Sequence, residues 1–97
     1  MPTTHDKTAL RIAKKQGATY NPGHGPDINT SRQAIEVASA GTIKVAMFRL
    51  RGFQKPVYIA GKDPSATKAV LKAVEGTTVG VMDPNGNVLK RSTRKRG

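Results

Sequence analysis

The chain of 97 residues carries 17 Lys and Arg against six Asp and Glu, a formal net charge of +11, and no cysteine. This length fits one domain, and a positive charge of this size points to a polyanion as partner, with nucleic acid ahead of an acidic membrane or protein. Disulfides and cysteine-based zinc sites are excluded, and we expect a cytoplasmic protein. The sequence shows no transmembrane-length apolar run, no signal-peptide-like stretch, and no helix with the apolar aromatic face that membrane-surface binding needs.

The first predicted element is a helix over residues 7–16. Ala9, Ile12 and Ala13 give it one apolar stripe, and Gly17 offers a stop. The opposite face is cationic and has no interleaved acids, so we expect it to contact phosphates rather than to be only a solvated surface. The residues of this face are Lys7, Arg11, Lys14 and Lys15.

A turn-rich loop over residues 20–25 then leads directly into Gly25-Pro26-Asp27-Ile28. Residues 33–37 alternate polar and apolar and predict a strand. Thr42 is the expected N-cap of a second helix, whose core-facing stripe runs from Ile43 to Leu50 and which Gly52 closes.

The second half predicts two more strands, a helix and a hairpin. Residues 56–60 form a nearly continuous apolar run, typical of a strand covered on both faces. Asp63-Pro64 begins a third helix, which ends before Gly76, and residues 77–82 form a further strand. The turn 83–86 returns the chain through a hairpin arm over 87–90.

This order, αββαβαββ, predicts an α/β fold with a mixed central sheet of about five strands flanked by helices. We expect a single domain over residues 1–89, which homodimerisation would help to stabilise. The basic segment 90–97 is expected to be a flexible C-terminal tail that adds salt-dependent affinity for phosphates.

Asp27 and Glu36 are the strongest chemical signal, because each lies within a short strand-like apolar stretch of a strongly positive chain. If the two stretches pair, both carboxylates could reach one Mg²⁺, with the carbonyl of Val37 as a third ligand. Bound Mg²⁺ or Mn²⁺ would suit phosphodiester hydrolysis. The alternative, at even weight, is that Glu36 pairs with Arg32 or Arg49 as a surface salt bridge while Asp27 caps the Gly-Pro turn.

From Gly25-Pro26-Asp27-Ile28 through Ile35-Glu36-Val37 to the apolar strand at Val57, the chain resembles the PD-(D/E)xK nuclease superfamily. Small Holliday-junction-resolvase-like nucleases of that superfamily are similar in size and basic character. The resemblance covers roughly residues 5–82 and its motifs are short. It implies a restriction-endonuclease-like fold, metal held at Asp27 and Glu36, and an acid from the first helix, for which Asp6 is the nearest candidate.

The chain departs from that pattern at Ala38, where the superfamily has a lysine that orients the attacking water. Three explanations stand. The cation comes from the following helix, with Lys44 as the candidate; the chain has lost activity and only binds; or Ala38 is an inactivating replacement. We put the first slightly ahead.

His24, just before Asp27, is a candidate general base or phosphate contact, although a turn histidine is more often simply exposed. His5 is expected to be terminal and disordered. Tyr20, Phe48, Phe53 and Tyr58 are the only aromatic residues, so a stacking platform for single strands is not expected, and backbone contact to duplex or branched DNA fits better.

The sequence therefore predicts a Mg²⁺- or Mn²⁺-dependent endonuclease that hydrolyses DNA, with Asp27, Glu36 and Lys44 as catalytic residues and a branched junction as the substrate implied by the resemblance. The alternatives are an inactive nucleic-acid-binding protein of the same fold and a structured-RNA-binding protein. The expected nucleic-acid contacts are Arg11, Lys14, Lys15, His24, Arg32, Arg49, Arg51, Lys90, Arg91, Arg94, Lys95 and Arg96.

Overall fold

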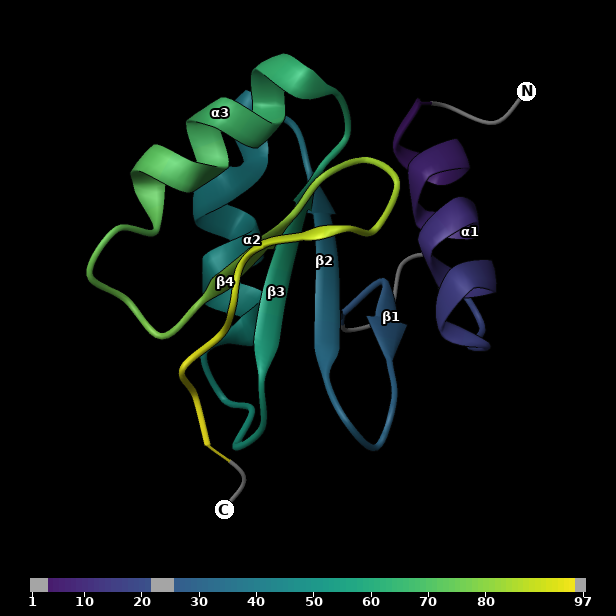
Figure 1. The fold of residues 1–97 in the computed structure, drawn as a ribbon, viewed down its shortest axis with the longest axis horizontal. Coiled ribbons are helices and arrows are strands. Elements are labelled where there is room, and N and C mark those ends of the chain that lie inside the picture. Colours follow the sequence, from purple (N-terminus) through teal and green to yellow (C-terminus); the bar gives the residue numbers. More distant parts are fainter. Residues whose placement is uncertain (1–3, 22–25, 96–97) are drawn as a thin grey trace.

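The computed structural model describes residues 4–21 and 26–95 of the chain. In this part, the helices and strands follow one another in the predicted order αββαβαββ (Figure 1). The elements are α1 (Thr4–Gln16), β1 (Ile28–Asn29), β2 (Ala34–Ala38), the short 3₁₀ turn η1 (Ala40–Thr42), α2 (Ile43–Leu50), β3 (Val57–Gly61), α3 (Pro64–Ala73), β4 (Gly80–Met82) and β5 (Val88–Lys90).

Some boundaries differ from the predicted ones. Helix α1 begins at Thr4, three residues before the expected start, and β4 begins only at Gly80. Thr42 does not cap α2 with its side chain, since η1 precedes the helix; its Oγ1 instead accepts a hydrogen bond from the Ser39 N–H at 2.9 Å. The predicted start of α3 is confirmed, because Asp63 Oδ1 accepts the N–H of Ala66 at 2.7 Å.

The five strands form one mixed sheet in the order β1-β2-β3-β4-β5. The three central strands are parallel, and the short edge strands β1 and β5 run antiparallel to their neighbours. The two parallel connections, through α2 and α3, each step one strand in the same direction. Because such crossovers are right-handed, both helices are expected on the same face of the sheet.

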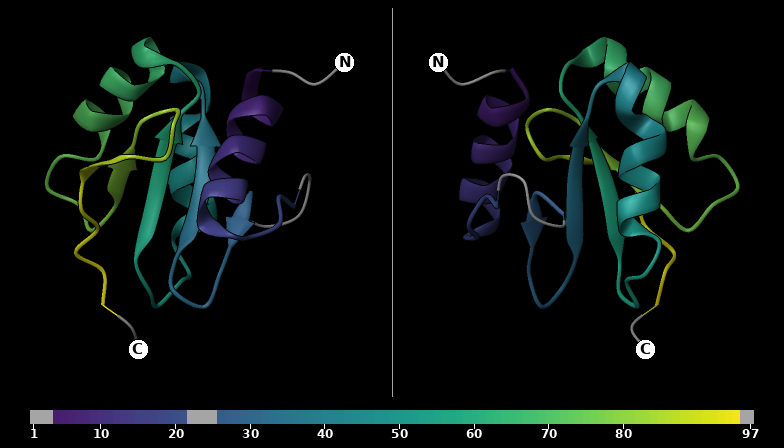
Figure 2. Two further views of the ribbon diagram at one scale, coloured as in Figure 1. Left: turned by 45° about the vertical axis from the view of Figure 1, so that its right-hand side comes forward. Right: turned by 180° about the vertical axis from the view of Figure 1, so that it is seen from behind.

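The two views in Figure 2 agree with this expectation: α2 and α3 lie on one face of the sheet and α1 lies on the other. Each face has its own apolar core. Leu50, Val70 and Val81 belong to the core beneath α2 and α3. Ile12 and Ile35 belong to the core beneath α1. The neighbouring strand residues 34, 36 and 38 therefore face α2, while 35 and 37 face α1.

The sequence predicts a flexible tail over residues 90–97. In the structure this segment is packed against the sheet as far as Arg94. Lys90 ends β5, and its ammonium donates to the carbonyls of Val74, Thr77 and Val79 at 3.3, 3.1 and 2.6 Å. The Arg94 guanidinium donates to the Leu50 carbonyl, which lies at the end of α2. Arg91 and Lys95 are exposed, and Arg96 lies outside the described residues.

None of the helices formed by residues 4–21 and 26–95 has both the length and the apolar character needed to cross a membrane.

Candidate functional site

Asp27 and Glu36 face each other at the open end of the β1–β2 hairpin. Ile28 pairs with Ile35 and Asn29 with Ala34 in the antiparallel ladder. Extending this register by one step places Asp27 opposite Glu36. The pairing of two acids from neighbouring strand segments, predicted from their spacing, is thus what the structure shows.

Each acid is anchored by the backbone of the other segment. The Asp27 N–H donates to Glu36 Oε1 at 2.8 Å, and the Val37 N–H donates to Asp27 Oδ2 at 2.8 Å. These crossed hydrogen bonds extend the β1–β2 ladder where main-chain pairing has ended. They also hold both carboxylates in one orientation, and Asp27 is therefore more than a cap on the Gly-Pro turn.

Both carboxylates are buried, Glu36 with 2% and Asp27 with 4% of its surface exposed. Burial raises the pKa of Glu36 from 4.5 to about 7, and the negative charge of Asp27 adds to the rise. The Asp27 N–H and the guanidinium of Arg49 act in the opposite direction without cancelling it. Near neutral pH, Glu36 therefore either keeps its proton or needs a further cation to stabilise the two negative charges of the pair.

Helix α2 supplies the cation beside Glu36, and this cation is Arg49 rather than Lys44. Arg49 Nη1 lies 3.4 Å from Glu36 Oε2. The Arg49 side chain is half exposed while Glu36 is buried, so the predicted alternative of a Glu36–Arg49 pair is present, but as a partly buried contact instead of a surface one. Lys44 lines a different depression with Met47 and Ala73.

A small hollow of about 140 Å³ opens between β2 and α2 at this point. Glu36 and Val37 line the hollow from β2, and Val45 and Arg49 line it from α2. His5 of α1 also lines it. Ala38, which stands where the superfamily pattern has lysine, is fully buried in the apolar core under α2. The hollow is thus reached by an arginine from the helix and by no cation from β2.

His5 and Asp6 lie in the first turn of α1, and His5 connects this helix to the acid pair. His5 Nε2 lies 3.2 Å from Asp27 Oδ2, so His5 is an ordered residue of α1 and the expectation that it is disordered is wrong. Asp6 Oδ1 accepts the hydroxyl of Tyr20 at 2.7 Å. Burial, the bond to Asp6 and the charges of Asp27 and Glu36 all raise the pKa of Tyr20, which keeps its proton. Extending the predicted helix by one turn would have placed His5 and Asp6 at its start.

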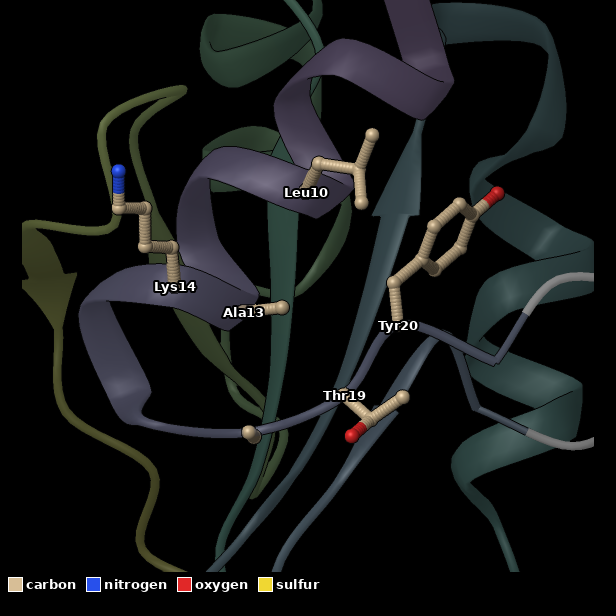
Figure 3. Close-up of a pocket in the computed structure, with 6 residues that line it drawn as sticks. Leu10, Ala13, Lys14, Thr19 and Tyr20 are labelled. Atoms are coloured by element: carbon tan, nitrogen blue, oxygen red, sulfur yellow. The ribbon is translucent and has the colours of Figure 1, made fainter.

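The predicted phosphate-binding face of α1 is only partly available. Arg11 Nη1 donates to the Pro84 carbonyl at 3.2 Å, and Lys15 Nζ donates to Asn87 Oδ1 at 2.8 Å, so both bind the turn between β4 and β5. Lys14 instead borders an open depression beside Tyr20, between α1 and the segment that follows it (Figure 3).

The other predicted contacts lie apart from the acid pair. Arg32, in the β1–β2 turn, is exposed and Arg49, not Arg32, takes the place beside Glu36. Arg51 is exposed at the end of α2. His24 falls outside the described residues.

The donor set of the acid pair suits a hard divalent cation. Mg²⁺ typically binds through one or two carboxylates and completes its shell with water and substrate phosphate. Asp27 and Glu36 supply two carboxylates next to each other, and their mutual repulsion is what a cation relieves. Among residues 4–21 and 26–95, three or more His, Cys, Asp or Glu side chains do not converge on one metal position.

Comparisons with protein-family models, with curated proteins and with solved structures found no match for this chain.

Proposed function

We propose that the chain is a metal-dependent phosphodiesterase that acts on nucleic acid, with a fold of the restriction-endonuclease-like type. One observation carries this proposal: two carboxylates are buried next to each other in a chain of net charge +11. Burying two like charges side by side costs stability, and such costs are typical of functional sites. The described topology, a mixed five-stranded sheet with helices on both faces, is compatible with that fold.

In this proposal Asp27 and Glu36 hold Mg²⁺ or Mn²⁺. The bound cation would polarise the scissile phosphate and lower the pKa of an attacking water. Val37 fixes the Asp27 carboxylate through its N–H, which leaves the pair preorganised before the cation arrives. The role of a third ligand from the Val37 carbonyl stays a prediction.

Arg49 is the residue best placed to replace the missing lysine. Its guanidinium already lies at the hollow, and half of its side chain is accessible to a substrate. A guanidinium can bind two phosphate oxygens at once, which positions a phosphodiester and neutralises its developing charge. His5, in contact with Asp27, is placed to accept or deliver a proton at the same edge of the hollow.

The nucleic acid is expected to cross the hollow along α2. From Val37 to Lys62 the sequence contains no Asp or Glu, and its five cations are Lys44, Arg49, Arg51, Lys55 and Lys62. Such a run attracts phosphates independently of base sequence. DNA, and branched DNA first, is the preferred substrate on the resemblance of the motifs alone.

A second candidate is a nucleic-acid-binding protein without catalysis. It is favoured by the burial of Ala38, which leaves β2 without a cation, and by the Arg49–Glu36 contact, which partly neutralises the acid that would hold the metal. In that case Glu36 keeps a proton near neutral pH, and no divalent cation is bound.

The test combines cleavage with a separate measurement of metal binding. The protein is incubated with an end-labelled four-way junction, a duplex, a single strand and a structured RNA, each with Mg²⁺, Mn²⁺ or EDTA. Asp27→Asn should abolish cleavage and leave binding in EDTA equal or tighter, because it removes a negative charge facing phosphate. Glu75→Gln, which alters an exposed glutamate outside the site, is the matched control.

Metal binding is read from thermal stability, since a ligand that binds only the folded state raises the melting temperature. Mn²⁺ at pH 8 should stabilise the native protein and Glu75→Gln alike, and should not stabilise Asp27→Asn. Absence of both cleavage and Mn²⁺ stabilisation would favour the non-catalytic candidate. Stabilisation without cleavage would show that the acids hold metal while Arg49 does not replace the lysine.

A further inference from the structure

The outer face of α2 combines an exposed aromatic ring with cations. The buried side of the helix consists of Ile43, Ala46 and Leu50. Phe48 points away from this core and has 62% of its surface exposed, more than any other large apolar residue that the structure describes. Val45, one turn earlier on the same side, is 50% exposed. An exposed phenylalanine beside an exposed valine indicates a contact surface.

This face adjoins the acid pair directly. Val45 and Arg49 border the hollow that contains Glu36. Phe48 follows Val45 by three positions and precedes Arg49, so the ring lies on the surface that continues outward from the hollow. A phosphodiester held beside Arg49 would bring its neighbouring nucleotide within range of the ring.

The charges around Phe48 indicate which class of molecule would bind to this face of α2. The Arg51 guanidinium carbon lies 4.5 Å from the centroid of the Phe48 ring, and Lys44 and Arg49 are exposed on the same helix. Because α2 and its flanks carry no acid, a second copy docked symmetrically through this same face would bring cations against cations. A nucleic acid supplies both complements at once, since its phosphates pair with the arginines and its bases stack on the ring.

We propose that Phe48 is a stacking site for an unpaired base, flanked by Arg49 and Arg51 as phosphate contacts. The substrate is then a nucleic acid with an unstacked nucleotide next to the scissile position, as at a bulge, a flap or a branch point. The inference deepens the proposed function and rests on it for the position of cleavage, but the binding step itself needs no catalysis. It departs from the expectation, based on the four aromatic residues, that the chain carries no stacking platform for single strands.

The experiment uses the full chain in EDTA and two end-labelled DNA probes, a perfect duplex and the same duplex with one unpaired adenine. Affinities are measured by fluorescence anisotropy at one fixed salt concentration. The native protein should prefer the bulged probe. Phe48→Ala should weaken binding of the bulged probe by about 5- to 150-fold, the effect of losing one base–aromatic stack, and leave the perfect duplex unchanged.

Three controls sharpen this result. Phe48→Trp should retain the preference for the bulge. Arg51→Gln should weaken both probes, because a phosphate contact is common to them. Leu89→Ala removes another exposed apolar side chain, on β5 at the other edge of the sheet from β1, and should change neither affinity.

An equal loss on both probes with Phe48→Ala, or no loss on either, would overturn the stacking site. So would sedimentation data in which the native chain is a dimer and Phe48→Ala is a monomer, because the ring would then be covered by a second copy. Each of these outcomes is independent of cleavage. A protein that cuts DNA without using Phe48 keeps the proposed function, and one that stacks the bulge but never cuts keeps only the binding step.

Discussion

Replacing Glu36 by glutamine should change how the stability of the protein depends on pH. The folded state holds the Glu36 proton up to about pH 7, whereas the unfolded chain releases it near pH 4.5. Below pH 4.5 both states carry the proton. Between the two values only the folded state does, so each increase in pH favours unfolding. Above about pH 7 Glu36 is ionised in both states, and the loss of stability with rising pH is complete.

The size of the effect follows from the two pKa values. A rise from 4.5 to about 7 corresponds to about 3 kcal/mol of unfolding free energy that the native protein loses across this window. Glu36→Gln keeps a side-chain oxygen for the Asp27 N–H but cannot ionise. The stability of Glu36→Gln relative to the native protein should therefore increase by about 3 kcal/mol between pH 4.5 and pH 8.

Urea denaturation of both proteins, followed by circular dichroism at several pH values without divalent cations, measures this difference. Other titrating groups contribute to both proteins and largely cancel. Glu75→Gln, at an exposed position, should follow the native profile. A difference between Glu36→Gln and the native protein that is the same at pH 5 and pH 8 would refute the argument that burial and Asp27 hold a proton on Glu36.

Asp27→Asn removes the negative charge beside Glu36 and keeps an oxygen for the Val37 N–H, so the pKa of Glu36 should fall from about 7 while burial holds it above 4.5; carbon NMR of the Glu36 carboxyl measures this, and an unchanged pKa would contradict it. Lys90→Ala, which removes the ammonium that donates to three carbonyls, should destabilise the fold by about 1–3 kcal/mol in thermal denaturation, and Arg91→Ala by less than about 0.5 kcal/mol; equal effects would mean that the segment is not packed on the sheet. Gly61→Ala should also destabilise, by about 1–3 kcal/mol or more, because the new Cβ would lie 2.4 Å from the backbone nitrogen of residue 67; a stability equal to that of the native chain would show that α3 can move away from β3.

Several features of this protein follow from local sequence alone. Apolar stripes at helical spacing and short apolar runs placed the elements in their observed order, because those patterns follow directly from the periods of helix and strand. The residues Asp63-Pro64 also predicted the start of α3, where Asp63 caps the helix. The spacing of Asp27 and Glu36 across a hairpin predicted that the two residues lie close together, because an antiparallel register brings residues at this spacing opposite each other.

Tertiary structure alone decided which other groups join the acids. Lys44 and Arg49 lie five positions apart on α2, roughly 140° around the helix axis, and only the packing of the helix on β2 selects the side that faces Glu36. His5 reaches Asp27 because α1 crosses the opposite face of the sheet and its first turn meets the end of the hairpin. Lys90 and Arg94 are also fixed by distant carbonyls. Such contacts join residues far apart in the chain, and no local periodicity encodes them.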